Sequence, residues 1–474
     1  MSLINVYYMA REYLFIGGIL AVLIIVSFLV IRHFHAKRNG TTHRKINGKR
    51  LFWWLVFLCY IFVVIGATML SRGSNYEYET ISPLFFSYKN AWNSWSVTEW
   101  RNIILNICMF VPFGLLLPMG IKWFRKFYKT YAAGFLFSLL IELSQRIFKV
   151  GIFEPDDLLD NTLGAAIGFG LFIVLFKLYA KEKANLRKGA TFASNIPLIL
   201  TVAIFVSIYV SYSCKELGNN NNRYVKQYGI NRINVYGEKF TDDSQRRLMV
   251  YESEALTEKE AYKRAEELFK KFDGEADIYY AGYYDDEAWI RARVGDEGSK
   301  EIRIKYAGGT YEYCDMDYGY SATDYYSKAA TSYDEQEVRE VLKEHGCDIC
   351  SEAVFTAEDD MRFRFEVDRC EENGDIVDGS LEVKLSKDKR IILLKDNLIT
   401  LKPYKEYDVI SEAEAYKQLT EGKFKRYGND YLNIEVIDCR IAYSIDTKGF
   451  YQPNYRFDVN INGKEAWIMI PALK

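Results

Sequence analysis

Acidic and amide side chains cluster at the ends of apolar segments in the first half of the chain. Glu142 and Gln145 are three residues apart, and Asp157 and Asn161 are four apart, so each pair shares one face of a helix. Ionisable groups inside or beside a bilayer are costly and are usually functional. Carboxylate and amide oxygens also suit hard cations such as Mg²⁺. The spacing therefore indicates a polar pocket that binds a ligand or a metal ion.

A third segment contributes an amide pair to the same predicted pocket. Asn102 and Asn106 lie one helical turn apart. Pro155 fits the first turn of a helix, where acids are favoured by the helix dipole, so we assign Glu154 and Asp156 to a structural role there. The candidate ligand-binding residues are Asn102, Asn106, Glu142, Gln145, Asp157 and Asn161.

Histidine chemistry is not expected at this pocket. Three of the four histidines, His33, His35 and His43, lie in one basic loop, and His345 lies in the second half of the chain. The polar segments also lack a nucleophilic serine elbow and a phosphate-binding loop. We therefore predict no catalytic residue, no metal ligand set and no cofactor. A metal-dependent enzyme acting on a lipid-linked phosphate remains an alternative.

Six apolar runs must position these residues, and each is close to the ~20 residues needed to cross a bilayer. Residues 1–213 carry 22 Lys and Arg against 10 Asp and Glu, whereas residues 214–474 carry 39 against 53. The chain is thus predicted to join a basic membrane domain, residues 1–213, to an acidic soluble domain. The expected spans are 13–31, 51–70, 102–121, 130–148, 159–179 and 195–213.

Basic loops set the expected orientation, because Lys and Arg near membrane segments stay on the cytoplasmic side. Such residues concentrate in loops 32–50, 122–129 and 177–188. The N-terminus and everything after Cys214 are then extracytoplasmic, and the polar pocket opens outward. We expect a multi-pass protein of the cell membrane.

Small residues predict close packing between the pocket-bearing helices. Gly164 and Gly168 form a small-xxx-small pair, and Gly114 lies in the third span. Pro112 is expected to kink that span and to free a carbonyl that needs a partner. Asn106 could supply this partner or contact a ligand.

The motifs together resemble the VanZ-like membrane family over residues 51–180. They are NIILNICMFVPFGLLLP (102–118), ELSQ (142–145) and EPDDLLDNTLGAAIG (154–168). Glu154 stands where the family commonly has Asp, and Asp160 stands where it usually has an apolar residue. The resemblance implies a role in tolerance of teicoplanin and related glycopeptides in Gram-positive bacteria, without a settled biochemical activity. It places the family's polar residues on Asn102, Asn106, Glu142, Gln145, Asp156, Asp157, Asn161 and Gly164.

The second half of the chain predicts an α+β domain of helices packed on antiparallel sheets. LTEKEAY (256–262) and ISEAEAY (410–416) each place Ser or Thr three residues before Glu, which is a capping box, and a looser copy begins at Tyr333. Strand-like runs follow each helix. We predict a linker at 214–240 and an extracytoplasmic domain at 241–474, with repeat-like units at about 241–330, 331–400 and 401–474.

The last stretch, from residue 410 onward, resembles the PepSY-like modules of extracytoplasmic regulators such as YycI. That resemblance implies binding of a peptide or an envelope protein. An undedicated surface domain is the alternative. Cys347 and Cys350, which face the oxidising side in this topology, predict a local disulfide.

The sequence thus favours a non-enzymatic envelope protein. Its expected partners are membrane lipids or a lipid-linked cell-wall precursor at the pocket, and a peptide or protein at the outer domain, but no nucleic acid. An envelope sensor or regulator is a further alternative to the enzyme.

Overall fold

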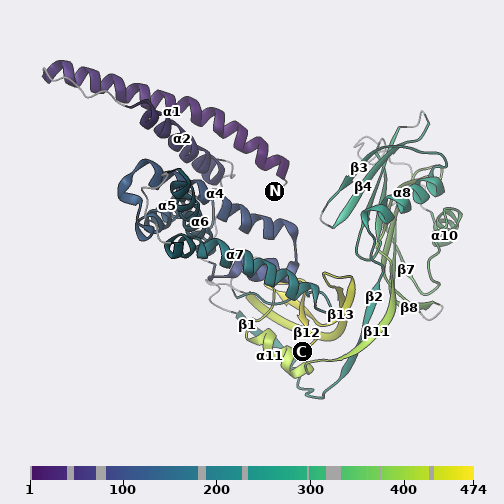
Figure 1. The fold of residues 1–474 in the computed structure, drawn as a ribbon. Helices are drawn as coiled ribbons and strands as arrows, with labels where there is room; N and C mark the ends of the chain where they lie inside the picture. Colours follow the sequence, from purple (N-terminus) through teal and green to yellow (C-terminus); the bar gives the residue numbers. More distant parts are fainter. Residues whose placement is uncertain are drawn as a thin grey trace. The chain divides into compact units, whose positions relative to one another are not determined.

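The computed structural model divides into two compact units, one mainly helical and one built on a β-sheet (Figure 1). We call them the helical unit, built mainly from residues 1–215, and the sheet unit, built from residues 216–223, 235–425 and 433–474. The predicted fold class, a polytopic helical domain followed by an α+β domain, is confirmed. The structure describes residues 3–39, 47–70, 82–179, 188–226, 233–284, 286–295, 298–316, 333–359, 361–372, 375–425 and 432–474.

Long helices form at all six predicted spans. Five of them are long and apolar enough to cross a membrane, namely α1, α2 with its continuation η1, α4, α6 and α7. Helix α5 falls below that mark because Glu142, Gln145 and Arg146 lower the mean hydropathy of its last turns. The helices of this unit are α1 (Leu3–Asn39), α2 (Gly48–Ile65), the π-helix η1 (Gly66–Leu70), α3 (Phe86–Ser94), α4 (Val97–Gly120), the 3-10 helix η2 (Lys122–Phe124), α5 (Phe127–Ile147), α6 (Pro155–Tyr179) and α7 (Lys188–Ser213).

Helix α6 packs between α4 and α5, and its contact with α4 is unusually close (Figure 1). A Cβ atom added to Gly164 would lie 2.0 Å from the carbonyl oxygen of Ile107. One added to Gly168 would lie 2.0 Å from the oxygen of Val111, and one on Gly114 would lie 1.9 Å from that of Ala165. The three predicted packing glycines therefore let the backbones of α4 and α6 touch. Helix α4 continues through Pro112 without a break.

Aromatic and aliphatic side chains fill the spaces around this crossing. Phe110, Phe113 and Ile141 are buried together with Ala165, which comes from α6. Ile103, Ile107 and Ile167 form a second buried cluster. The core of the helical unit thus lies between α4, α5 and α6, where the predicted polar residues are also found.

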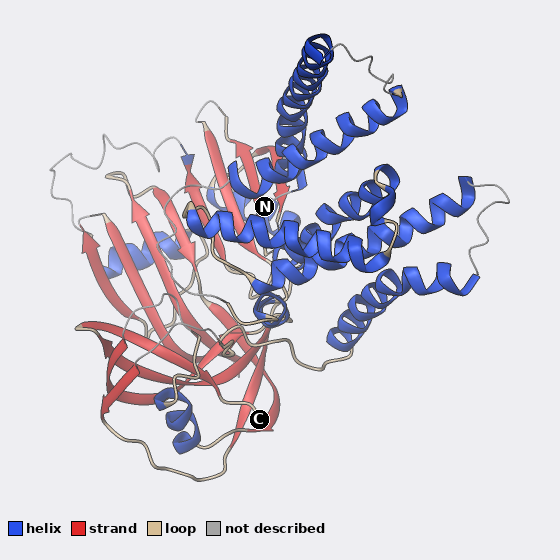
Figure 2. Ribbon diagram, turned by 90° about the vertical axis from the view of Figure 1, so that its left-hand side faces the viewer, coloured by secondary structure: helices blue, strands red, loops and turns tan. Residues whose placement is uncertain are grey.

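The sheet unit contains one continuous sheet in which the strand pairs of known register are antiparallel (Figure 2). The strands hydrogen-bond in the order β1-β12-β13-β2-β11-β9-β10-β6-β5-β4-β3, with β14 on β13 and β7-β8 on β9. The strands are β1 (Ile233–Gly237), β2 (Arg247–Ser253), β3 (Asp277–Tyr283), β4 (Glu287–Arg293), β5 (Ser299–Lys305), β6 (Tyr311–Asp315), β7 (Val354–Asp359), β8 (Arg362–Glu372), β9 (Asp375–Leu385), β10 (Ile391–Asp396), β11 (Ile399–Asp408), β12 (Leu432–Ile445), β13 (Phe450–Ile461) and β14 (Lys464–Pro471).

Three amphipathic helices of this unit begin where the sequence placed their caps. Helices α8 (Glu258–Phe272) and α10 (Glu335–Glu344) open with complete capping boxes at Thr257 and Asp334. Helix α11 (Glu412–Thr420) opens at Ser411, whose side chain accepts a hydrogen bond from the backbone N–H of Glu414. Helices α8 and α10 share one hydrophobic core, so the first two predicted repeat-like units pack as a single body.

Part of the predicted linker, 214–240, is firmly built into the sheet unit. The backbone N–H of Gly218 donates to Asp446 at 2.7 Å, and the N–H of Asn219 donates to Thr447 at 2.7 Å. Asn220 is buried and donates to Asn454 at 3.0 Å. Residues 216–223 therefore do not form a free tether, because buried amides fix them to the β12-β13 hairpin.

Adding a methyl group at the α4–α6 crossing is expected to destabilise the helical unit. Gly164→Ala and Gly168→Ala should each cost about 1–3 kcal/mol, because backbone must move to admit the new atom. Thermal unfolding of the purified protein in detergent measures the effect. Gly189→Ala in α7 is the control, since open space surrounds that residue. Midpoints equal to that of the control would show that the crossing is not close-packed.

Candidate functional site

The site is organised by the first turns of α6, where acids and an amide project in several directions. Pro155 begins the helix, and Asp156 and Asp157 lie in its first turn. Asp160 and Asn161 follow one turn later, and Asp156, Asp160 and Asn161 are all buried. Each of these polar side chains has a hydrogen-bond partner on another helix or at its start.

Asp156 caps a different helix from the one that carries it. Its carboxylate accepts hydrogen bonds from the backbone N–H groups of Phe85, at 2.5 Å, and Ser87, at 2.8 Å. Helix α3 needs this help, because its own N-cap residue, Phe85, has a φ of 66° and gives no side-chain cap. We expected Asp156 to serve the start of α6. Instead, Asp156 uses both carboxylate oxygens to fix α3 against α6.

Asp160 makes a second connection to α3. The hydroxyl of Tyr88 donates a hydrogen bond to the Asp160 carboxylate. Burial, and then the nearby Asp160 carboxylate, raise the pKa of Tyr88, so its hydroxyl stays protonated and remains a donor. Asp160 is the acid that departs from the VanZ-like pattern. Its burial against Tyr88 gives that departure a structural reason.

Asn106 and Asp157 join α4 to α6. The Asn106 amide nitrogen donates to the Asp157 carboxylate at 2.7 Å. This contact uses one N–H of the Asn106 amide, and the expected bond to a carbonyl freed by Pro112 stays a prediction. Asp157 is only half-buried. Apart from the exposed Asn102, this pair is therefore the least buried of the predicted pocket residues.

Glu142 closes the turn between α5 and α6. Its carboxylate accepts a hydrogen bond from the backbone N–H of Glu154 at 3.1 Å, and its side chain is 1% exposed. The bond fixes the last turns of α5 next to the residue that precedes α6. Charge at this buried position thus also serves the packing of the two helices.

Gln145 and Asn161 are deeply buried amides with one oxygen each left over. The Gln145 nitrogen donates to the carbonyl of Thr68 at 2.8 Å, and the Asn161 nitrogen donates to the Ser138 hydroxyl at 2.8 Å. In the part of the chain that the structure describes, no donor reaches Gln145 Oε1 or Asn161 Oδ1. A buried acceptor without a donor costs about 1–3 kcal/mol. These two oxygens are thus buried acceptors to which no donor is matched among the described residues.

Five of the six predicted residues make hydrogen bonds between elements of the helical unit, in four separate contacts, and the sixth does not take part. Asn102 is exposed and lies outside the hydrogen bonds described above. Sequence reasoning missed Tyr88, Ser138 and Thr68. Ser138 was within reach, because it lies four residues before Glu142 and seven before Gln145 on the same helical face. Tyr88 and Thr68 have no such helical spacing from a predicted residue that would have pointed to them.

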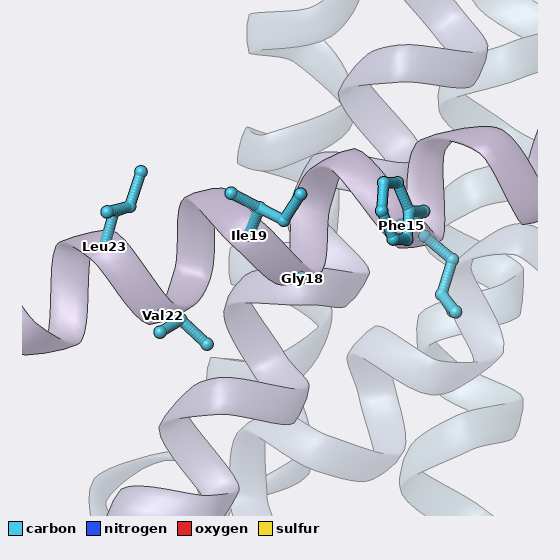
Figure 3. A pocket seen from close by; sticks show the side chains of 6 residues that line it. Phe15, Gly18, Ile19, Val22 and Leu23 are labelled. Atoms are coloured by element: carbon cyan, nitrogen blue, oxygen red, sulfur yellow. The ribbon is translucent and has the colours of Figure 1, made fainter.

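Two other features do not extend this network. A cavity of about 460 Å³ lies on α1 (Figure 3) and is lined by Gly18 and five apolar residues, as expected of a lipid-facing helix. Among the described residues, no three His, Cys, Asp or Glu side chains are grouped as a metal site would need. In the sheet unit, Cys347 and Cys350 are buried free thiols, and burial raises the pKa of Cys347. The disulfide between them stays a prediction.

Comparison with known proteins places the network inside a recognised region. The VanZ/LLP1 family model matches residues 52–177. Residues 52–177 are VanZ-like. Protein VanZ of Enterococcus faecium is 29% identical over 114 residues, which are 24% of this chain and 69% of that protein. All six predicted pocket residues, together with Asp156 and Asp160, fall within the VanZ-like region.

Two solved structures resemble about half of the chain. The C-terminal domain of Bacillus megaterium YpeB aligns with a TM-score of 0.21 and 15% identity, covering 47% of this chain and 95% of that domain. An uncharacterized protein from Eubacterium rectale aligns with a TM-score of 0.26 and 12% identity, covering 50% of this chain and 87% of the other.

Removing the carboxylate of Asp156 is expected to release α3. In Asp156→Ala, the amides of residues 85–88 should exchange with deuterium at least about tenfold faster, because two charge-assisted hydrogen bonds are lost. Asp156→Asn keeps one acceptor oxygen, so its exchange rates should lie between those of the unmodified protein and those of Asp156→Ala. Hydrogen exchange read by mass spectrometry measures this, with Glu99→Gln in the first turn of α4 as the control. Unchanged exchange in Asp156→Ala would contradict the cap.

Proposed function

We propose that this protein is a non-enzymatic, VanZ-like membrane protein of the cell envelope that binds a lipid-linked cell-wall precursor. In this proposal the network at the start of α6 opens outward, and the sheet unit lies outside the membrane. Binding of the precursor contributes to tolerance of teicoplanin-type glycopeptides. The match of residues 52–177 to the VanZ/LLP1 model supports the family part of the proposal.

The observation that carries the binding part is the pair of unmatched amide oxygens. Gln145 is 1% exposed and Asn161 is 3% exposed, and among described residues neither oxygen receives a hydrogen bond. A precursor's sugar hydroxyls and amide N–H groups are donors of the required kind. Asn106 and Asp157, the half-buried pair, offer further polar contact at the same helix start. The ligand is thus expected to bind through hydrogen bonds to amides.

Replacing the two amides by leucine should lower glycopeptide tolerance. Gln145→Leu and Asn161→Leu keep side-chain size but remove the acceptor oxygen, which should weaken binding about tenfold for each lost bond. They also remove the N–H groups that bond Thr68 and Ser138, so the unfolding midpoint of each variant is measured alongside. The minimal inhibitory concentration of teicoplanin is measured in a host expressing the full-length chain at matched levels. Asn195→Leu in α7 is the control, because it likewise removes a half-buried amide that bonds carbonyl groups, those of Thr191 at 2.8 Å and Gly170 at 3.5 Å, but lies outside the proposed binding residues. Tolerance equal to that of the control would contradict the proposal.

Glu142→Gln separates binding from metal-dependent catalysis. Glutamine keeps an oxygen that can accept from the backbone N–H of Glu154, but it removes the charge that a cation would need. The binding proposal expects near-normal tolerance in this variant. Loss of tolerance, together with loss of metal-dependent turnover on a purified lipid phosphate, would instead favour the enzyme.

A second candidate, an envelope sensor, is favoured by the short connection between α7 and the sheet unit. Helix α7 ends at Ser213, and Gly218 is already hydrogen-bonded to Asp446. The Asp446 carboxylate also accepts from the N–H of Lys448 at 2.7 Å and from the Gln452 amide at 2.6 Å. A ligand-induced movement of the hairpin would therefore be passed to α7 through few residues.

Lengthening this connection tests the sensor. Insertion of four Gly-Ser residues after Lys215 should leave folding and tolerance intact but abolish the response of a wall-stress reporter to teicoplanin. Thermal unfolding of the insertion variant serves as the folding control. A reporter response equal to that of the unmodified chain would contradict the sensor function.

A further inference from the structure

The sheet unit contains a groove whose lining is charged and aromatic. Its volume is about 660 Å³, and it lies among residues of β8, β9 and β12, with single contributions from β7, β13 and β14. The opposite face of β8 is apolar, since Phe363 and Phe365 are buried in the hydrophobic core. The period of two along the strand therefore directs the charged residues of β8 to the groove.

A β-bulge interrupts this period and places two charges at the groove. The pairing of β8 with β9 shifts between Val367 and Cys370. Within the bulge, Arg369 has a φ of 52°, which a residue with a side chain rarely adopts. Asp368 and Arg369 are both exposed and line the groove. Bulges re-aim side chains near binding sites, and such strained backbone is concentrated there.

The guanidinium of Arg369 rests on an aromatic ring rather than on an acid. It lies 4.3 Å from the centre of the Tyr443 ring, and no ion pair joins it to a described residue. Stacking on the ring orients the guanidinium, and a side-chain hydrogen bond with Tyr443 uses part of its N–H edge, so that its other N–H groups remain for a ligand. Arg364, by contrast, is paired with Glu366 at 2.9 Å.

Two further arginines reinforce the positive charge. Arg440 and Arg456 are directly opposite each other on β12 and β13. Both use the same carboxylate, Asp458, at 3.4 and 2.7 Å. Like charges in this cross-strand position repel, and one acid neutralises only one of them. On this side of the groove two arginines thus share one acid, although the lining as a whole contains as many acids, Glu352, Glu366, Asp368 and Asp378, as arginines.

Asp378, an acid of the groove that interacts with Arg369, is a poor counter-ion for it. Asp378 is half-buried, and burial followed by the neighbouring Asp368 raises its pKa, while Arg369 lowers it. A carboxylate supplied by a ligand would meet Arg369 without that burial cost. Planar guanidinium groups bind carboxylates through two parallel hydrogen bonds.

We propose that the groove binds a peptide through its terminal carboxylate, which Arg369 receives while stacked on Tyr443. The groove volume is within the usual range for small-ligand sites, roughly 300–1,000 Å³. This inference deepens the expectation that the outer domain binds a peptide, and it rests on that expectation. It names the site, the residue that contacts the ligand and the chemical group recognised.

A matched pair of probes tests the proposal on the full-length protein in detergent micelles. N-acetyl-trialanine carries a free carboxylate, and N-acetyl-trialanine amide is the same peptide without the charge. Isothermal titration calorimetry should show at least about tenfold tighter binding of the acid, as expected for a charge-assisted bidentate contact. Arg369→Gln should abolish this preference. Arg247→Gln is the control, because Arg247 is an exposed arginine on β2 outside the groove.

A second variant distinguishes loss of the guanidinium from loss of the fold. Arg369→Gly suits the positive φ, so the bulge should be retained while the guanidinium is removed. This variant should keep the unfolding midpoint within a few degrees and lose the preference for the acid. Equal affinity for acid and amide in the unmodified protein would overturn carboxylate recognition but leave peptide binding in place. Binding of neither probe would overturn both.

Discussion

The contact between the backbones of α4 and α6 is the constraint on which the helical unit depends. Gly114, Gly164 and Gly168 place no side chain of their own at the crossing, and carbonyl oxygens occupy the space that their Cβ atoms would take. Lipid offers little hydrophobic gain for bringing helices together, so close packing and hydrogen bonding must supply the stability. At this separation the first turn of α6 can reach α4 directly, as the Asn106–Asp157 bond shows.

The polar residues turn that packing into a defined arrangement of four elements. Asp156 and Asp160 fix α3, Glu142 fixes the end of α5, and Gln145 fixes η1 through Thr68. Most acids of the cluster that the sequence shows therefore hold helices together by hydrogen bonds. Fewer groups remain candidates for ligand binding. They are the two amide oxygens without a donor among described residues and the half-buried Asn106–Asp157 pair. In the proposed function, the nitrogens of these amides serve packing and their oxygens serve binding.

Periodicity and spacing predicted the helices well because their causes are local. The apolar runs, the capping residues Thr257 and Ser411, and the small-residue spacing of Gly164 and Gly168 all act within a few turns of chain. Partners across the structure were harder to predict. Asp156 caps a helix some 70 residues earlier in the chain, and Gly218 meets Asp446 across 228 residues. Arg369 could not be found at all from the sequence, because its role arises from a bulge and from a tyrosine on another strand. The attachment of residues 216–223 to the hairpin was hidden for the same reason, since the partners of Asn219 and Asn220 come close only in the folded protein.

The central claim is that the VanZ-like region holds a wall-precursor lipid through the amides of Gln145 and Asn161. Native mass spectrometry of the purified full-length protein, with its co-purified lipids, tests this most directly. We predict a bound lipid whose mass and fragments identify a sugar-bearing lipid-linked precursor, retained in Asn195→Leu and lost when Gln145 and Asn161 are both replaced by leucine. Precursor retained equally in the double variant, or only bulk phospholipid bound to the unmodified protein, would contradict the account.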